Sequence, residues 1–194
     1  MHCYNCAKEF AEGFEKCPNC GATIKYSDID GIKTATNLNS RAQMLASQGR
    51  YEEAIEAYLE ALEQFPDYAV AHYNLGLAYQ ARKRYSEAIA SYTRAIEMKP
   101  DFAAAYTGRG DSRLAMDERE AAVDDYSMAI ELYPDYAMAY FKRSGVFDLM
   151  QKFEEALADL KSYLTYKPHD VRARKKMKAL AATCSQPWEP GQDF

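Results

Sequence analysis

Residues 69–102 read AVAHYNLGLAYQARKRYSEAIASYTRAIEMKPDF, which has the pattern of one helix–turn–helix unit. Shifting the window by 34 residues in either direction returns the same skeleton. A small residue, a large ring four positions later and a closing proline recur at that interval. These positions are Ala54, Ala88, Ala122 and Ala156; Tyr58, Tyr92 and Tyr126, with Leu160 in the fourth copy; and Pro66, Pro100, Pro134 and Pro168. A fixed period of this length predicts a stacked array of helix pairs.

The repeated pattern resembles that of the tetratricopeptide repeat (TPR) family. The family's order of large residue, Leu-Gly, aromatic, Ala, aromatic, Ala and Pro is met in the second copy by His72, Leu75, Gly76, Tyr79, Ala88, Tyr92, Ala95 and Pro100. The resemblance implies an all-α fold in which helix-turn-helix repeats coil into a right-handed superhelix. Stacking is required because a single helix pair cannot bury its apolar face alone.

The period also divides the chain into segments. We expect four repeats within residues 36–170, preceded by a linker and followed by a capping helix and a tail. The repeats are residues 35–68, 69–102, 103–136 and 137–170, the linker is 25–35, the capping helix is 171–183 and the tail is 184–194. The capping helix carries five basic residues and no acidic one. This composition fits a solvated face, or else a contact for an acidic partner or a membrane surface.

The first 24 residues carry a different pattern, two pairs of cysteines. Cys3 and Cys6 form one pair and Cys17 and Cys20 the other, in the spacing C-x2-C-x10-C-x2-C. Two thiol pairs on tight turns supply four sulfur ligands for a zinc ion. The spacing and the turn CPNCG resemble the zinc-ribbon and rubredoxin-knuckle families. This resemblance implies a zinc ribbon over residues 1–24, whose folding would depend on one structural zinc ion.

Two other interpretations of these cysteines stay open. A knot of two disulfides would require an oxidising compartment, which nothing in the sequence indicates. A redox-active iron site would follow the rubredoxin likeness, although rubredoxins usually place a longer segment between their two knuckles. Structural zinc is the interpretation that the spacing favours.

Side chains on the first helix of each repeat form the candidate partner-binding site. In TPR-like folds the second, fifth, ninth and twelfth or thirteenth positions of that helix face a concave groove, and this spacing follows one helical stripe. The predicted groove residues are Asn39, Gln43, Val70, Tyr73, Asn74, Leu77, Thr107, Asp111, Leu114, Met138, Phe141 and Asp148. Exposed rings and aliphatic groups would be costly on an inert spacer, so we expect a groove for an extended peptide or a partner helix. The alternative is that the chain covers these side chains itself.

A clamp for chaperone tails is not expected. Chaperone-binding TPR domains hold a terminal carboxylate with a Lys–Asn–Asn–Lys–Arg set. The corresponding positions here are Asn39, Gln43, Asn74, Ala104 and Gly108. Only Asn74 matches, and the Lys and Arg of the last two clamp positions are replaced by Ala104 and Gly108.

Two ion pairs are predicted within repeats three and four. Arg109 and Arg143 share one position of their first helices, and Asp125 and Asp159 share the facing position of their second helices. Because the two residue types occur together in these copies, we expect Arg109 to pair with Asp125, and Arg143 with Asp159. In copy three, Arg113 replaces the aromatic residue of copy two, so that hairpin is expected to be the least well packed.

Composition argues against several classes of function. The formal net charge is −5, which gives no overall electrostatic footprint for nucleic acid. No apolar run approaches the roughly 20 residues that cross a bilayer, and no signal pattern is present, so we expect a cytoplasmic protein without a membrane contact. We also find no glycine-rich phosphate loop, nucleophile elbow or metalloprotease helix, so no enzyme activity is expected.

The sequence therefore predicts a non-catalytic adaptor that binds a protein or peptide in the groove of the array. The zinc ribbon would provide a second docking surface. An alternative is a regulator whose ribbon contacts nucleic acid or a nucleoprotein complex while the array recruits a protein. The sequence specifies neither the partner nor the oligomeric state.

Overall fold

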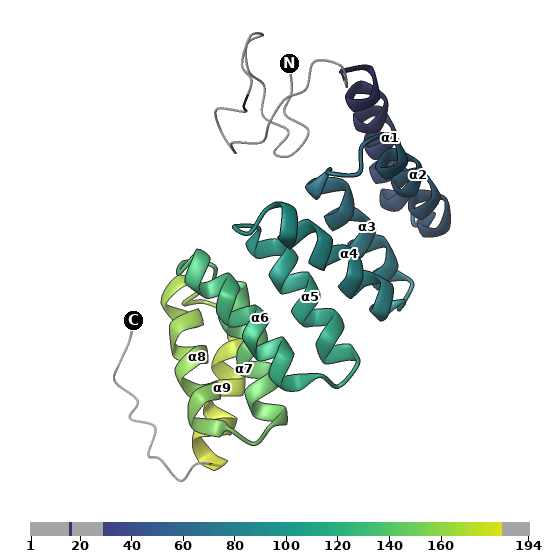
Figure 1. Ribbon diagram of the computed structural model, residues 1–194. Helices are drawn as coiled ribbons and strands as arrows, with labels where there is room; N and C mark the ends of the chain where they lie inside the picture. The colour runs from purple at the N-terminus through teal and green to yellow at the C-terminus, as the bar shows by residue number, and fades with distance from the viewer. Residues whose placement is uncertain (1–15, 17–28, 184–194) are drawn as a thin grey trace. The chain divides into compact units, whose positions relative to one another are not determined.

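The computed structural model describes residue 16 and residues 29–183, and every regular element in this part of the chain is an α-helix (Figure 1). The chain divides into two compact units between Gly108 and Arg109, inside the fifth helix.

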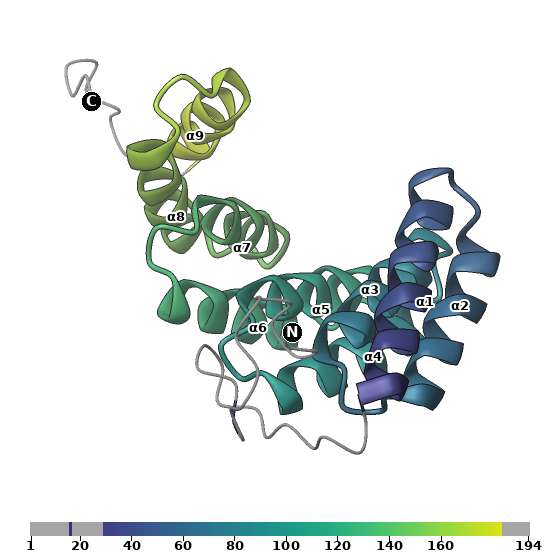
Figure 2. The same ribbon diagram turned by 90° about the horizontal axis from the view of Figure 1, so that it is seen from above.

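The first unit contains two complete helix pairs. Its helices are α1 (Ile29–Ser47), α2 (Tyr51–Gln64), α3 (Ala69–Ala81), α4 (Tyr85–Met98) and the first half of α5 (Ala103–Ala115). Helix α1 packs along α2, α2 along α3, and α3 along α4. The connections are short, so consecutive helices run antiparallel, as both ribbon views show (Figures 1 and 2).

The second unit continues the same plan. It contains the second half of α5, then α6 (Arg119–Leu132), α7 (Ala137–Leu149), α8 (Phe153–Tyr166) and α9 (Val171–Thr183). Helix α6 packs on α7, α7 on α8, and α8 on α9. Helix α9 buries Ala173, Leu180 and Ala181 in a cluster with side chains of α7 and α8. The last helix therefore covers the apolar face that α8 would otherwise expose.

The turn inside each helix pair has one backbone geometry. Gly49, Lys83, Asp117 and Gln151 all have positive φ angles, between 57° and 77°. In each turn the following N–H donates to a carbonyl five residues earlier, for example Arg84 N to Tyr79 O at 2.9 Å. This is the Schellman cap that ends a helix in a left-handed residue. Only the first copy has the glycine that this conformation prefers.

Tyrosine and glycine pack against each other in the core of the first unit. Tyr92 of α4 is fully buried. A Cβ atom at Gly76 of α3 would lie 2.7 Å from its ring, and one at Gly108 of α5 would lie 2.6 Å from it. Both glycines are therefore needed for α3 and α5 to approach the tyrosine.

The structure corrects the predicted linker. Helix α1 begins at Ile29, so residues 29–35 of the expected linker 25–35 are helical. Ala35 is 1% exposed, and a Cβ at Gly31 would lie 3.4 Å from the carbonyl oxygen of Gln64 at the end of α2. The sequence periodicity was weak here because, of residues 31–35, only Ala35 is buried.

Candidate peptide-binding surface

The α3 stripe, which we define as Val70, Tyr73, Leu77 and Gln80, lies on the first unit. Leu77 is 41% exposed, and Val70 and Tyr73 are half-buried. The ring centroid of Tyr73 lies 4.7 Å from that of Phe102 and 5.8 Å from that of Tyr92. Two rings behind it therefore hold Tyr73 in place, while Leu77 on the next turn remains open to solvent.

Three predicted groove residues of the first unit are not accessible. Asn39 is 4% exposed, Asn74 9% and Thr107 5%. The Nδ2 of Asn74 donates to the Oδ1 of Asn39 at 3.1 Å, which joins α1 to α3. The Thr107 hydroxyl donates to the Ala103 carbonyl oxygen at 2.9 Å. As surface contacts these three predictions are wrong, because close approach of neighbouring first helices buries the side chains. Gln43 is exposed as expected.

The α7 stripe, which we define as Met138, Phe141, Gly145, Asp148 and Leu149, lies on the second unit. Met138 is 44% exposed and Leu149 56%. Phe141 is half-buried, and its ring centroid lies 5.0 Å from that of Tyr163. The stripe thus repeats the plan of the α3 stripe, with a braced ring beside an open aliphatic side chain.

Ion pairs join the first helices of the second unit. The Nζ of Lys142 on α7 lies 2.8 Å from both carboxylate oxygens of Asp111 on α5, which also accepts a hydrogen bond from the Tyr126 hydroxyl at 2.7 Å. The Nζ of Lys176 on α9 lies 3.3 Å from Asp148 on α7. The predicted groove residues Asp111 and Asp148 therefore hold helices together. The lysines that pair with them were missed, since each lies on another helix and the two spacings differ.

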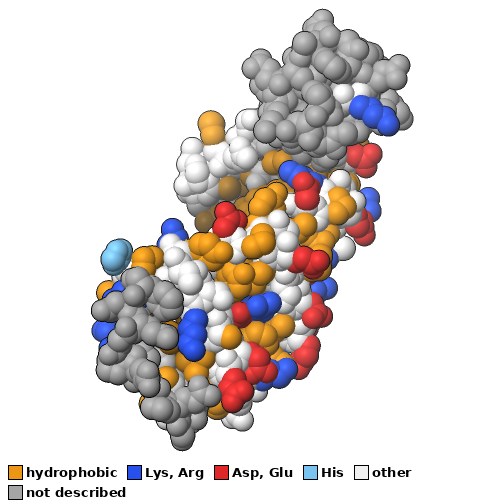
Figure 3. Space-filling view, turned by 90° about the vertical axis from the view of Figure 1, so that its left-hand side faces the viewer, with side chains coloured by type: hydrophobic (Ala, Val, Ile, Leu, Met, Phe, Trp, Pro, Cys, Tyr) orange, Lys and Arg blue, Asp and Glu red, His pale blue; other side chains and the backbone are white. Residues whose placement is uncertain are grey.

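Leu114 also differs from the expected groove position. It is half-buried and packs against the cluster formed by Ala122, Tyr126 and Val146. Of the twelve predicted residues, the exposed ones are Gln43, Leu77 and Met138. Figure 3 shows one face of the molecule, on which hydrophobic side chains lie exposed among acidic and basic ones.

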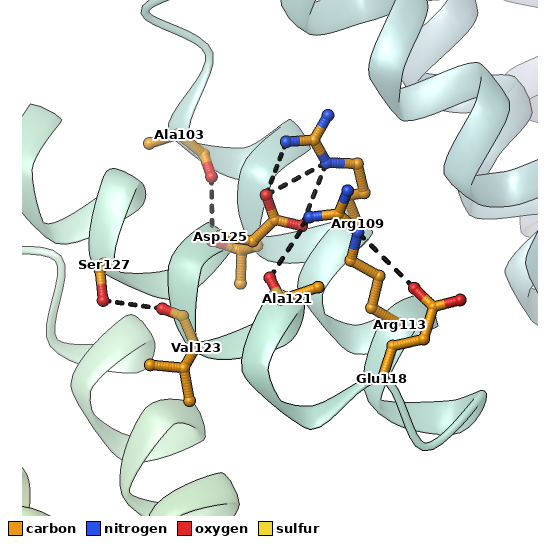
Figure 4. A network of polar contacts seen from close by, with 9 residues as sticks. Ala103, Arg109, Arg113, Glu118, Ala121, Val123, Asp125 and Ser127 are labelled. Carbon is orange, nitrogen blue, oxygen red and sulfur yellow. Dashed lines mark hydrogen bonds and ion pairs between the residues drawn. The ribbon is translucent and has the colours of Figure 1, made fainter.

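Both predicted ion pairs inside the repeats are confirmed. The Nη2 of Arg109 lies 2.6 Å from Asp125, and the Nη2 of Arg143 lies 2.7 Å from Asp159. Arg113 joins the first pair, with its Nη1 2.9 Å from the other carboxylate oxygen of Asp125 (Figure 4). In copy three, this ion pair of Arg113 therefore occupies the position at which copy two has the aromatic side chain of Tyr79.

The predicted metal ligands Cys3, Cys6, Cys17 and Cys20 lie outside the described residues. Residue 16 and residues 29–183 include no group of three or more His, Cys, Asp or Glu side chains placed to hold a metal ion. In the same part of the chain, no helix combines the length and apolar character needed to cross a membrane.

Comparison with known proteins agrees with this geometry. Three family models match: "TPR repeat" at residues 42–83, and two models described as "Tetratricopeptide repeat" at residues 69–102 and 107–171. Among curated proteins, the comparison gave no match.

Solved structures give the same assignment. The chain is similar to MamA, with 26% identity and a TM-score of 0.74 over 79% of this chain and 84% of that one. It is similar to the first TPR of Spaghetti (RPAP3) bound to the HSP90 peptide SRMEEVD, with 26% identity and a TM-score of 0.60 over 61% and 94%. The second TPR domain of human RPAP3, in complex with the HSP70 peptide SGPTIEEVD, has 25% identity and a TM-score of 0.58 over 60% and 97%. From residue 42 to residue 171, this chain is built of tetratricopeptide repeats.

Proposed function

We propose that the chain is a non-catalytic adaptor that binds an extended peptide or a helix of another protein through the first helices of its repeats. One observation carries the proposal: Tyr73 and Phe141, two repeats apart at equivalent positions, are both half-buried rings braced by other rings. An exposed aliphatic side chain lies beside each, Leu77 in one stripe and Met138 in the other.

Such an arrangement suits the capture of apolar anchors. A ring already held in position loses little side-chain freedom when a partner contacts it. The entropy cost of ordering that side chain on binding is therefore small. Aromatic residues and methionine, the residue types of Tyr73, Phe141 and Met138, are also enriched at the cores of protein–protein interfaces. Peptide binding by the two RPAP3 domains supports the same use of the repeat surface here.

The preferred peptide differs from the chaperone tails bound by those domains. Asn74, the single residue that matches the carboxylate clamp of chaperone-binding TPR domains, is buried and hydrogen-bonded to Asn39. The two late clamp positions hold Ala104 and Gly108, which carry no charge. We therefore propose that apolar side chains of the partner, and not a terminal carboxylate, supply the contacts.

Selection of peptides from a displayed random library on the full chain tests this proposal. The selected peptides should lose at least about tenfold in affinity for the Tyr73→Ala, Phe141→Ala double variant, since a hot-spot truncation costs about 2 kcal/mol or more. The matched control is Leu59→Ala with Tyr133→Ala, which removes exposed apolar side chains outside both stripes. Equal affinity of the double variant and the control would contradict the proposal.

We further propose that the four cysteines bind one structural zinc ion and that this ribbon is a second docking surface. The donor set supports zinc, because four thiolates in two C-x2-C turns complete a tetrahedral shell. Metal analysis of the purified chain should give one zinc per chain, lost in Cys17→Ser. Iron in its place, or four oxidised thiols without metal, would contradict the assignment. A salt-dependent shift with nucleic acid that Cys17→Ser abolishes would favour the regulator alternative.

A further inference from the structure

The two helices of largest net charge in the described chain have opposite signs. Helix α2 carries five acidic residues and no basic one, whereas α9 carries five basic residues and no acidic one. The acidic residues are Glu52, Glu53, Glu56, Glu60 and Glu63, and the basic residues are Arg172, Arg174, Lys175, Lys176 and Lys178. The other charged helices of the described chain carry both signs.

On each helix the charges gather on one exposed side. All five glutamates of α2 are exposed, and at 3.6 residues per turn they lie within an arc of about 100°. Arg174, Lys175 and Lys178 are exposed and occupy a similar arc of about 100° on α9. An exposed apolar side chain lies beside each arc: Leu59, 42% exposed, and Val171, 63% exposed.

Much of this charge has no counterpart within the described residues. Glu52 pairs with Arg82 at 2.7 Å, and Glu53 pairs with Arg50. Glu56, Glu60 and Glu63 make no ion pair there, and neither do Arg174 and Lys175.

The distribution is unfavourable for each helix on its own. Glu56 and Glu60 are like charges four residues apart, as are Arg174 and Lys178, and such pairs destabilise a helix. Glu63 lies in the last turn of α2, where the helix dipole disfavours an anion. Arg172 and Arg174 lie in the first turn of α9, where it disfavours a cation. A bound surface of opposite charge would offset both penalties.

We propose that the basic face of α9 binds the acidic face of α2 in a second copy of the chain. Charge complementarity selects this occupant, since α2 offers the densest acidic face among the described helices. Each copy offers both surfaces, so the contact either occurs twice in a two-fold dimer or continues from copy to copy as a ring or a chain. Its ion pairs are exposed, so salt should weaken it.

Sedimentation velocity of the full chain over a range of concentrations tests the proposal. At about 0.01 M salt we expect concentration-dependent association, which should be lost at about 1 M salt, where the Debye length falls to about 3 Å. The triple variant Glu56→Lys, Glu60→Lys, Glu63→Lys should associate at least about tenfold more weakly, and so should Arg174→Glu, Lys175→Glu, Lys178→Glu. Mixing the two triple variants should restore association, because each then offers the charge that the other lacks.

A matched variant controls for net charge. Glu120, Asp124 and Glu131 on α6 are exposed, and changing all three to Lys alters the net charge as much as the α2 triple variant does. This control should associate like the wild type. Both test variants place favourable charges at the helix ends, so their monomers should melt no lower than the wild type. A wild type that stays monomeric at low salt would overturn the proposal. The same holds if the monomeric wild type binds anionic vesicles, because the basic face of α9 would then bind a membrane surface and not a second copy. Failure of the mixture to associate would also overturn it.

Discussion

Arg109 of α5 and Asp125 of α6 form an ion pair inside the third repeat, with Nη2 2.6 Å from Oδ1. The Asp125 side chain is 2% exposed and that of Arg109 14%. Arg113, one turn further along α5, donates to the second carboxylate oxygen of Asp125 and, at 3.3 Å, to the Ala121 carbonyl oxygen (Figure 4). One buried carboxylate thus bridges two guanidinium groups that would otherwise repel each other, and the Glu118 carboxylate lies 4.0 Å from the Nε of Arg113.

Replacing Asp125 by Asn should strongly destabilise the protein. The amide keeps the shape of the side chain but removes the carboxylate that pairs with both arginines, so that Arg113 keeps only the Glu118 carboxylate, 4.0 Å away. Removing one partner of a buried pair costs about 3–5 kcal/mol. Urea unfolding of the full chain, followed by circular dichroism, gives the free energy of unfolding. Asp124→Asn, at the exposed neighbouring position, should stay within about 0.5 kcal/mol of the wild type. A loss below about 1 kcal/mol in Asp125→Asn would contradict this account.

The ion pairs could be predicted from the sequence because equivalent positions of the repeats can be compared with one another. Arg109 and Arg143 recur at one position, and Asp125 and Asp159 at another, so their joint occurrence indicates contact. The role of Arg113 could not be predicted this way. It replaces a tyrosine in only one copy, and nothing in the period says that the same aspartate would accept it as well.

Accessibility of the candidate surface was harder to predict than the fold. Helical periodicity gives the direction of a side chain on its own helix, but not the distance to the neighbouring helix. Asn39 and Asn74 were both predicted to face the groove, yet α1 and α3 approach closely enough for the two amides to bond and be buried. Leu77 and Met138 stay exposed on the same kind of stripe.

Glycines at two positions of the repeats should respond oppositely to alanine. In Gly76→Ala the new Cβ would lie 2.7 Å from the Tyr92 ring, which is fully buried and cannot move away. Overpacking of this kind costs about 1–3 kcal/mol. At Gly145 the nearest atom is the flexible Lys176 Nζ at 3.8 Å, so Gly145→Ala should gain about 1 kcal/mol of helix propensity. Thermal unfolding of both variants measures the difference, and equal melting temperatures would refute it.

The left-handed turn residues offer a second matched pair. Gly49 and Lys83 occupy the same position of copies one and two, with φ angles of 77° and 57°. A residue with a Cβ is strained there by about 1–2 kcal/mol. Glycine avoids this strain, but part of the gain in stability is offset because glycine gives the unfolded chain more conformational freedom. We therefore expect Gly49→Ala to lower the melting temperature and Lys83→Gly to raise it. Shifts of the same sign in the two variants would show that turn strain does not determine the outcome.

His72 should make stability depend on pH in the mildly acidic range. Its Nε2 lies 2.9 Å from the Pro66 carbonyl oxygen, to which the neutral ring can donate. Burial lowers the pKa of the His72 imidazole below its usual value of about 6.5, although the bond to Pro66 opposes the shift. As the pH falls below about 6.5, the imidazole of the unfolded chain binds a proton at a higher pH than the imidazole of the folded chain. The free energy of unfolding therefore decreases as the pH falls through the lowered pKa of the folded state.

Measured from pH 7 downwards, the free energy of unfolding of the wild type should therefore fall more steeply than that of His72→Gln. The glutamine amide can replace the donor to Pro66 but has no proton to gain. Carboxylates titrate in both proteins, so the difference between the two curves isolates the imidazole. Parallel curves between pH 7 and about 5 would mean that burial of His72 does not hold the ring in its neutral form.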